Sequence, residues 1–145
     1  MDDGVDCMDG PDRAADRKQP WRPATKETGG RTLVLTGRED TVLSDRMELT
    51  LLHTGALPYD LTGTGCAAGA LCGAFLAVMK EPEFAAAAAL SLLGLAIKKA
   101  DGAAGYGSYR IRLLDMLSET GPEELAAFTS RCLSNKTKEP EQELR

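Results

Sequence analysis

A glycine-rich turn directly precedes an apolar segment, and its residue types are suited to holding an anion. Gly63, Thr64 and Gly65 are followed by Cys66, and no charged residue comes after it until Lys80. Small residues allow successive backbone N–H groups to converge on one point, and the positive end of a helix dipole adds to their attraction for an anion. We therefore predict an anion site at this turn. The alternative is that Thr64 only caps a buried helix.

Cys66 is the side chain of this turn that could take part in proton transfer. The positive end of a helix favours the thiolate form, and a thiolate can accept a proton from a nearby hydroxyl group. The alternative is a small buried side chain that fills the first helical turn. Cys72 lies six residues further on and faces another side of the same helix, so we expect it to be a core residue.

Three short strands and two Ala-rich helices must position this turn. Apolar residues predict strands over 32–36, 41–43 and 47–53, the last two forming a β-hairpin that Asp40 helps to shape. Residues 66–80 and 83–99 predict helices with almost no polar face. We also expect an amphipathic helix over 109–118, one helical turn over 123–128 and an edge strand over 129–133. The fold class is therefore α/β.

Composition divides the chain into three segments. Residues 1–30 are an irregular acidic lead-in, residues 31–133 are the folded part, and residues 134–145 are a charged tail that we expect to be disordered. Two helices without a polar face need cover on several sides, and three short strands cannot supply it. We therefore expect the folded part to belong to a larger α/β layer, covered by another segment, by another subunit or through aggregation.

Charge and cysteine content argue against several classes of protein. The net charge of −5 and the absence of a basic patch argue against nucleic acid as a partner. Both apolar segments are shorter than the roughly 18–20 residues of a membrane span, and the first residues do not read as a signal peptide, so we expect no membrane association. The four cysteines form no CxxC pair and a single histidine cannot complete a zinc site. We assign no metal ligand and expect a cytoplasmic protein.

The order of these motifs resembles the C-terminal half of hydroxyethylthiazole kinase, an enzyme of the ribokinase-like fold. The resemblance covers about residues 4–118 and is carried by Leu35–Asp40, Leu61–Cys66, the Ala-rich helix pair, Gly105–Tyr109 and Leu113–Leu117. Cys66 stands where most ribokinase-like kinases carry aspartate. The resemblance implies a partial ribokinase-like layered fold, with short strands, a β-hairpin and two buried Ala-rich helices, that lacks its N-terminal half.

The resemblance also implies an activity and a role for each residue of the turn. The family uses ATP and Mg²⁺ to phosphorylate the hydroxyl of 4-methyl-5-(2-hydroxyethyl)thiazole in thiamine biosynthesis and salvage, and it forms a homotrimer. By this resemblance, Thr36 contacts the nucleotide phosphates and Gly63 borders the thiazole alcohol. The amides of Gly63, Thr64, Gly65 and Cys66 face the transferring phosphoryl group, and Cys66 is the catalytic base. The loop 105–107 lies near the nucleotide, and the Mg²⁺ ligands are expected in the missing N-terminal half.

Three functional interpretations stay open from the sequence. The first is a thiazole kinase that is complete only with its other half, and the second is a non-catalytic relic or interaction module that keeps the anion-binding turn. The third is a kinase for another small alcohol, although cysteine rather than aspartate at position 66 favours thiazole over sugar. For Thr36, the alternative role is a hydroxyl that bonds to its own turn. We interpret His53 and Asp60 as structural or solvated residues.

Overall fold

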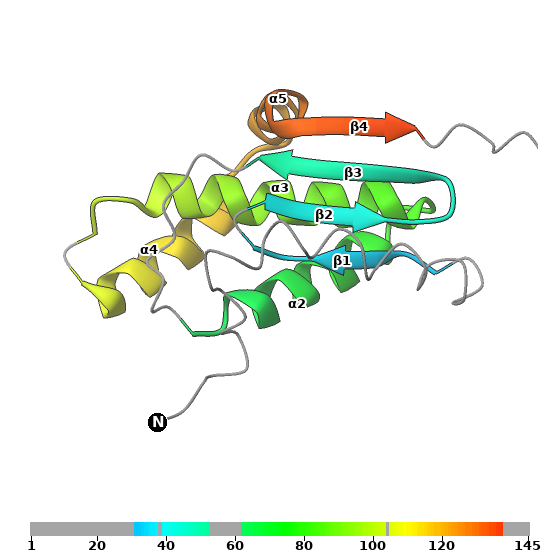
Figure 1. The fold of residues 1–145 in the computed structure, drawn as a ribbon. Helices are drawn as coiled ribbons and strands as arrows, with labels where there is room; N and C mark the ends of the chain where they lie inside the picture. The colour runs from blue at the N-terminus through cyan, green and yellow to red at the C-terminus, as the bar shows by residue number, and fades with distance from the viewer. Residues whose placement is uncertain (1–30, 38, 53–61, 104, 138–145) are drawn as a thin grey trace, which may run out of the picture.

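The structure is a computed structural model that describes residues 31–37, 39–52, 62–103 and 105–137. Within these ranges a four-stranded antiparallel sheet has the order β1-β2-β3-β4 (Figure 1). Its strands are β1 (Leu33–Leu35), β2 (Glu39–Leu43), β3 (Met47–Leu52) and β4 (Leu133–Thr137). The predicted hairpin is confirmed, and β1 extends it to a meander in which Val34 pairs with Val42, and Val42 with Leu49.

Side chains fix the two turns of this meander. The Asp40 carboxylate accepts a hydrogen bond of 3.0 Å from the Gly37 N–H, so in the described fold Asp40 shapes the turn between β1 and β2 rather than the β2–β3 turn of the predicted hairpin. In the turn between β2 and β3, the Ser44 hydroxyl oxygen accepts hydrogen bonds of 3.2 Å from the N–H groups of Arg46 and Met47. Such local bonds satisfy turn amides that have no strand partner.

Four helices lie between β3 and β4 in the described part of the chain: α2 (Thr64–Leu76), α3 (Pro82–Ala100), α4 (Tyr106–Glu119) and α5 (Pro122–Cys132). Pro82 and Pro122 stand at the first turns of α3 and α5, where their missing N–H costs no hydrogen bond. At α4, the Ser108 hydroxyl oxygen accepts a bond of 3.1 Å from the Gly105 N–H. These signals are local, which is why the sequence places the first three helices within three residues of their observed starts.

Helix α3 is the centre of the packing. It contacts β2, β3, α2, α4 and α5, and its Leu90 and Ala96 side chains are buried in the same cluster as Val42 and Leu49 (Figure 1). Helix α3 is therefore buried as expected. Helix α2 buries only Ala68, and its outer face is exposed in the described fold, with Gly69, Ala70, Gly73 and Ala74 on it. This exposed apolar face is the surface for which the sequence predicts additional cover.

The C-terminal elements differ from their predicted bounds. The helical turn expected over 123–128 is a longer helix that reaches Cys132, and the edge strand expected over 129–133 lies at Leu133–Thr137 instead. Thr129 fits inside the helix because its hydroxyl donates a 2.9 Å bond to the Leu125 carbonyl. Strand β4 thus includes residues 134–137 of the expected tail. Residues 1–30 and 138–145 lie outside the described residues, so the division into three segments stays a prediction.

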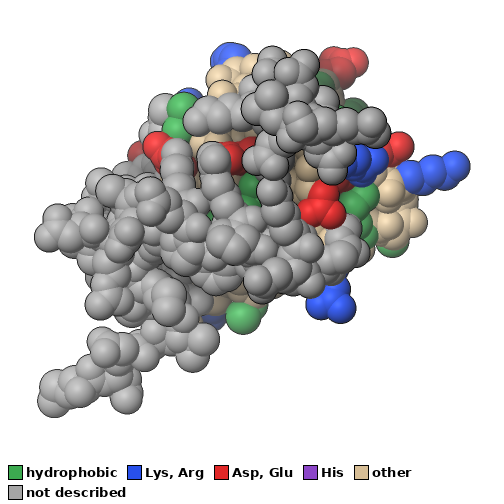
Figure 2. Space-filling model, turned by 45° about the vertical axis from the view of Figure 1, so that its right-hand side comes forward, with side chains coloured by type: hydrophobic (Ala, Val, Ile, Leu, Met, Phe, Trp, Pro, Cys, Tyr) green, Lys and Arg blue, Asp and Glu red, His purple; other side chains and the backbone are tan. Residues whose placement is uncertain are grey.

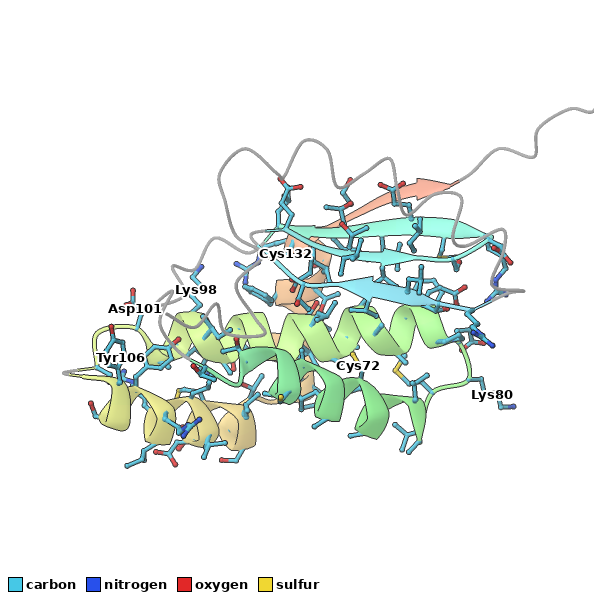
Figure 3. The ribbon with its side chains drawn as sticks, turned by 60° about the horizontal axis from the view of Figure 1, so that its bottom comes forward. Cys72, Lys80, Lys98, Asp101, Tyr106 and Cys132 are labelled. Atoms are coloured by element: carbon cyan, nitrogen blue, oxygen red, sulfur yellow. The ribbon has the colours of Figure 1, made fainter. Side chains whose placement is uncertain are left out.

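The helices and strands run between two distinct ends of the molecule. At the left of Figure 1 lie the last residues of β1, β3 and α3. The first residues of α2 and α4 lie at the same end. The β2–β3 turn and the α2–α3 turn lie at the opposite end. Figure 3 shows the same separation, with Lys98, Asp101 and Tyr106 at one end and Lys80 at the other. We refer to the first as the α2 N-terminal end and to the second as the hairpin end.

Charged side chains of both signs are spread over the face shown in Figure 2. Where described side chains are visible there, lysines and arginines lie among aspartates and glutamates. In the described part of the chain, no helix combines the length and the apolar character that crossing a membrane requires.

Candidate functional site

The first turn of α2 leaves its backbone N–H groups available. Gly63 is the N-cap, and the first helical hydrogen bond runs from the Ala67 N–H to the Gly63 carbonyl at 3.0 Å. No side chain caps the helix and its first turn contains no acidic residue. Among the described residues, no acceptor is recorded for the amides of Thr64, Gly65 and Cys66. Thr64 is therefore not the cap, and within the described part of the chain these three N–H groups at the helix N-terminus have no acceptor, which suits them to an anion.

Gly63 gives this turn its shape. Its φ of 99° and ψ of 1° lie in the left-handed region, which residues with a Cβ rarely adopt. A Cβ added at Gly63 would lie 3.6 Å from Nη2 of Arg110, an ordinary van der Waals contact. The glycine is thus required by the backbone conformation rather than by crowding.

The two cysteines of α2 have different environments. Cys66 is exposed, so the interpretation as a buried filler of the first turn is wrong for the described fold. Cys72 is partly buried against the core, as expected, on the middle of α2 in Figure 3. Burial, and secondarily the charge of Asp40, raises the pKa of the Cys72 thiol above its ordinary value. Cys72 therefore stays protonated at neutral pH and serves packing.

Thr36 directly follows β1 and is exposed. The end of β1 lies at the α2 N-terminal end of the molecule (Figure 1), although no hydrogen bond between described residues joins Thr36 to the α2 turn. The Asp40 carboxylate, rather than the Thr36 hydroxyl, bonds to the N–H of Gly37 in this turn. Gly63, Thr64, Gly65 and Cys66 thus form one cluster, and Thr36 shares only their end of the fold.

Arg110 of α4 lies beside the cluster. Its Nη2 donates a hydrogen bond of 3.4 Å to the Thr62 carbonyl, immediately before the N-cap. The sequence assigns no role to Arg110, because a lone arginine on the exposed face of an amphipathic helix has no local signature. The contact joins residues 48 positions apart, and it forms because α2 and α4, which both pack on α3, begin at the same end of the molecule.

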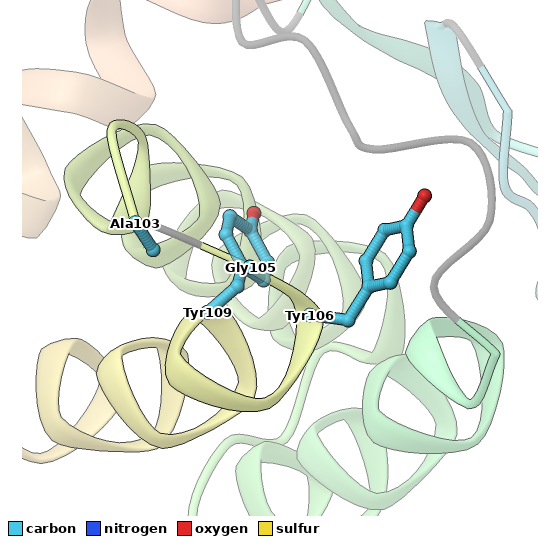
Figure 4. A pocket seen from close by; sticks show the side chains of 4 residues that line it. All are labelled: Ala103, Gly105, Tyr106 and Tyr109. Atoms are coloured by element: carbon cyan, nitrogen blue, oxygen red, sulfur yellow. The ribbon is translucent and has the colours of Figure 1, made fainter.

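A small cavity lies where α4 begins, at the same end of the molecule as the cluster. It has a volume of about 170 Å³ and is lined by Ala103, Gly105, Tyr106 and Tyr109 (Figure 4). The Tyr109 hydroxyl donates to the Ile97 carbonyl at 3.4 Å, and burial, followed by the charge of Asp101, raises the pKa of Tyr109. The cavity is smaller than the roughly 300 Å³ that small-molecule sites usually reach, so these residues alone do not enclose a nucleotide.

The described residues do not present a site for Mg²⁺. Within ranges 31–37, 39–52, 62–103 and 105–137, no three histidine, cysteine or carboxylate side chains are grouped to hold a metal ion. His53 and Asp60 lie outside the described residues, as does Cys7.

We predict that Gly63→Ala lowers the free energy of unfolding by about 1–2 kcal/mol, because alanine is strained at positive φ. Gly102→Ala is the matched control, since Gly102 has φ of 81° and an added Cβ there meets nothing within 4 Å. Urea denaturation followed by circular dichroism should give similar losses for both variants. Only Gly63→Ala should shift the amide resonances of Thr64, Gly65 and Cys66. Equal shifts in both variants would show that Gly63 does not shape the turn.

Comparison with known proteins gives a consistent match. The hydroxyethylthiazole kinase family model matches residues 3–123. The chain is 34% identical over 123 residues to a hydroxyethylthiazole kinase of Leptospira biflexa, covering 84% of this chain and 45% of that protein. It is 37% identical over 98 residues to the enzyme of Syntrophus aciditrophicus, covering 67% of this chain and 36% of the relative.

A solved structure, that of a hydroxyethylthiazole kinase protein from Pyrococcus horikoshii OT3, matches with a TM-score of 0.63 and 29% sequence identity. The match covers 86% of this chain and 50% of that chain. This chain thus spans half or less of the length of these relatives. The family match includes the turn and all of α2, α3 and α4, and the predicted partial ribokinase-like α/β fold is confirmed. With 121 of its residues matched by one family model, the chain belongs to the hydroxyethylthiazole kinase family.

Proposed function

We propose that this chain supplies the phosphoryl-transfer portion of a hydroxyethylthiazole kinase. The reaction transfers the γ-phosphoryl group of ATP to the hydroxyl of 4-methyl-5-(2-hydroxyethyl)thiazole, in thiamine biosynthesis or salvage. The observation that carries the proposal is the N-terminus of α2. Among the described residues, the amides of Thr64, Gly65 and Cys66 have no acceptor, and the Cys66 side chain is exposed. The names of the matched relatives support the choice of substrate.

The proposed roles follow the charge that develops during transfer. The amides of Gly63, Thr64, Gly65 and Cys66 receive the equatorial oxygens of the phosphoryl group, which carry most of the negative charge. Gly63 has no side chain and lets the thiazole alcohol approach, while Thr36 contacts the nucleotide phosphates. The alcohol oxygen bonds to the γ-phosphorus, the bond to the ADP oxygen breaks, and Sγ of Cys66 accepts the hydroxyl proton.

The remaining components come from outside this chain. Mg²⁺ would neutralise triphosphate charge, and we assign its ligands to the half of the kinase that this chain does not contain. We also propose the homotrimer that the resemblance implies, in the cytoplasm. The exposed apolar face of α2 supports the need for further protein around this fold.

The first test is an ATP-dependent phosphorylation assay with hydroxyethylthiazole. We expect the purified chain alone to show no activity, because it lacks Mg²⁺ ligands among its described residues. Co-expression with the N-terminal half of the Leptospira biflexa relative should restore product formation. If a soluble complex of the two halves binds MgATP and hydroxyethylthiazole but forms no product, the proposed function is wrong and the non-catalytic interpretation is favoured.

The same complex tests the role of Cys66. We expect Cys66→Ser to lower kcat by on the order of 10²-fold or less, because a primary alcohol keeps its proton until late in a loose transition state. Cys72→Ala is the control, since Cys72 lies on the same helix but packs against the core. It should leave kcat within about twofold. An unchanged kcat for Cys66→Ser would remove Cys66 from the mechanism while leaving the amide site in place.

A further inference from the structure

The core of the described fold is open on the side of β1. A row of paired residues crosses the helix-covered face of the sheet, with Leu49 on β3, Val42 on β2 and Val34 on β1. Leu49 and Val42 are 0% exposed and belong to the core cluster, whereas Val34 is 37% exposed. Helix α3 contacts β2 and β3, and β1 is the edge strand of the described sheet. The apolar core therefore ends at an uncovered side chain of an edge strand.

Helix α2 lies on this open side and is itself uncovered. It packs on α3, and no described strand contacts it extensively (Figure 1). Gly69 and Gly73 are exposed, and a Cβ built on either meets no atom of the described residues within 4 Å. Leu76 is 49% exposed, and the sequence from Thr64 to Met79 contains no charged residue. An uncharged, apolar helix face thus lies beside the open edge of the core, an arrangement typical of an interaction surface.

We propose that β1 and the exposed face of α2 form one docking surface, which receives a β-strand from the part of the kinase that this chain does not contain. The occupant is argued from length, since the chain covers 45% of the Leptospira biflexa relative and 50% of the matched solved chain. The inference rests on the proposed function and deepens it, because it names the surface on which the two parts of the enzyme meet.

A strand fits both parts of this surface. Along an edge strand, outward-pointing backbone N–H and C=O groups can pair with an added strand. Paired strands lie about 4.8 Å apart and a helix is about 10 Å wide, so one added strand reaches halfway across α2 and two reach across it. Every second side chain of the added strand would continue the row that ends at Val34 and would pack on α2. Gly69 and Gly73 leave room for these side chains.

The test co-expresses the tagged 145-residue chain with the N-terminal half of the Leptospira biflexa relative, and it measures how much of that half co-purifies. Gly73→Arg should reduce the co-purified amount at least about tenfold, because it places a charge in an apolar interface. The variant itself should fold well, since arginine favours a helix interior more than glycine does and the added side chain meets open space. Thermal unfolding of the chain alone should therefore give an equal or higher midpoint.

Ala126→Arg is the matched control. Ala126 is exposed on α5, which contacts α3 and β3 on the β4 side of the sheet, away from β1 (Figure 1). The same arginine there should leave the co-purified amount within about twofold. In the complex of the unmodified chain, amide hydrogen exchange should slow in Leu33–Leu35 of β1, because the added strand supplies new hydrogen bonds.

Each outcome decides for or against this surface. Equal co-purification with Gly73→Arg and Ala126→Arg overturns the inference, and so does failure of the unmodified chain to retain the partner half. If sedimentation shows that the chain alone is a dimer that Gly73→Arg converts to a monomer, a second copy occupies the surface and the inference is wrong. If Gly73→Arg releases the partner half, but the unmodified complex binds MgATP and hydroxyethylthiazole without forming product, the docking surface stands and the proposed function is wrong.

Discussion

Arg46→Ala is expected to lower the free energy of unfolding by about 3 kcal/mol, because it leaves a buried carboxylate without its cationic partner. Glu83 is 2% exposed, and the Arg46 guanidinium donates to both of its oxygens, at 3.0 Å each from Nη2. The Arg46 side chain is 65% exposed, so solvent weakens the pair and the value lies at the low end for buried ion pairs. Urea denaturation at pH 7 measures the loss. Arg131→Ala, at an exposed arginine of α5, should change the free energy of unfolding by less than about 0.5 kcal/mol.

The same pair makes a pH-dependent contribution. Burial alone would raise the pKa of Glu83, but hydrogen bonds from its own N–H, Ser44 and Arg46, together with the Arg46 charge, lower the pKa below the ordinary 4.5. The contribution is therefore complete above pH 4.5 and is lost as the pH falls through the lower folded-state pKa. The difference in stability between the unmodified chain and Arg46→Ala should narrow below that pH. A difference that stays constant down to pH 3 would contradict an ionised Glu83.

Leu90→Ala is expected to lower the free energy of unfolding by about 3 kcal/mol, through lost apolar burial and the cavity left behind. Leu90 is 1% exposed and lies in the middle of α3, the helix that most other elements contact. The neighbouring Ala86 and Ala87 have short side chains that cannot fill the space. Urea denaturation gives the value directly.

Leu114→Ala provides the matched control for this substitution. Leu114 is 61% exposed on α4, so the same chemical change should alter the free energy of unfolding by less than about 0.5 kcal/mol. Similar losses at both positions would mean that α3 is not the centre of the core.

The parts of the fold that the sequence predicts well are those with local signals. Pro82, the alanine run behind it and the Gly63 turn define α2 and α3 because each acts on the backbone within a few residues. The C-terminal bounds were wrong because β4 depends on pairing with β3, for example Leu133 with Leu51, more than eighty residues away. No local pattern reports such a pairing.

The residues of the candidate site also differ in whether a local sequence signal identifies them. The structure places four predicted residues in one cluster because they are consecutive at the start of α2: Gly63, Thr64, Gly65 and Cys66. Arg110 reaches the site through the packing of α4, so it becomes visible only in three dimensions. Thr36 lies at the correct end of the fold, and its contact with a nucleotide stays a prediction.

The two ends of the molecule should differ in how substitutions affect stability and ligand affinity. The Arg46–Glu83 ion pair belongs to the hairpin end, whereas the amides of the Gly63 turn and Arg110 belong to the α2 N-terminal end. Helix α2 alone, with 13 residues, separates the ends by about 20 Å. Substitutions in the ion pair should therefore alter the folded population without altering the intrinsic affinity of the folded molecules for phosphate. Thermal tolerance and the proposed phosphate binding should therefore respond to different substitutions in this chain.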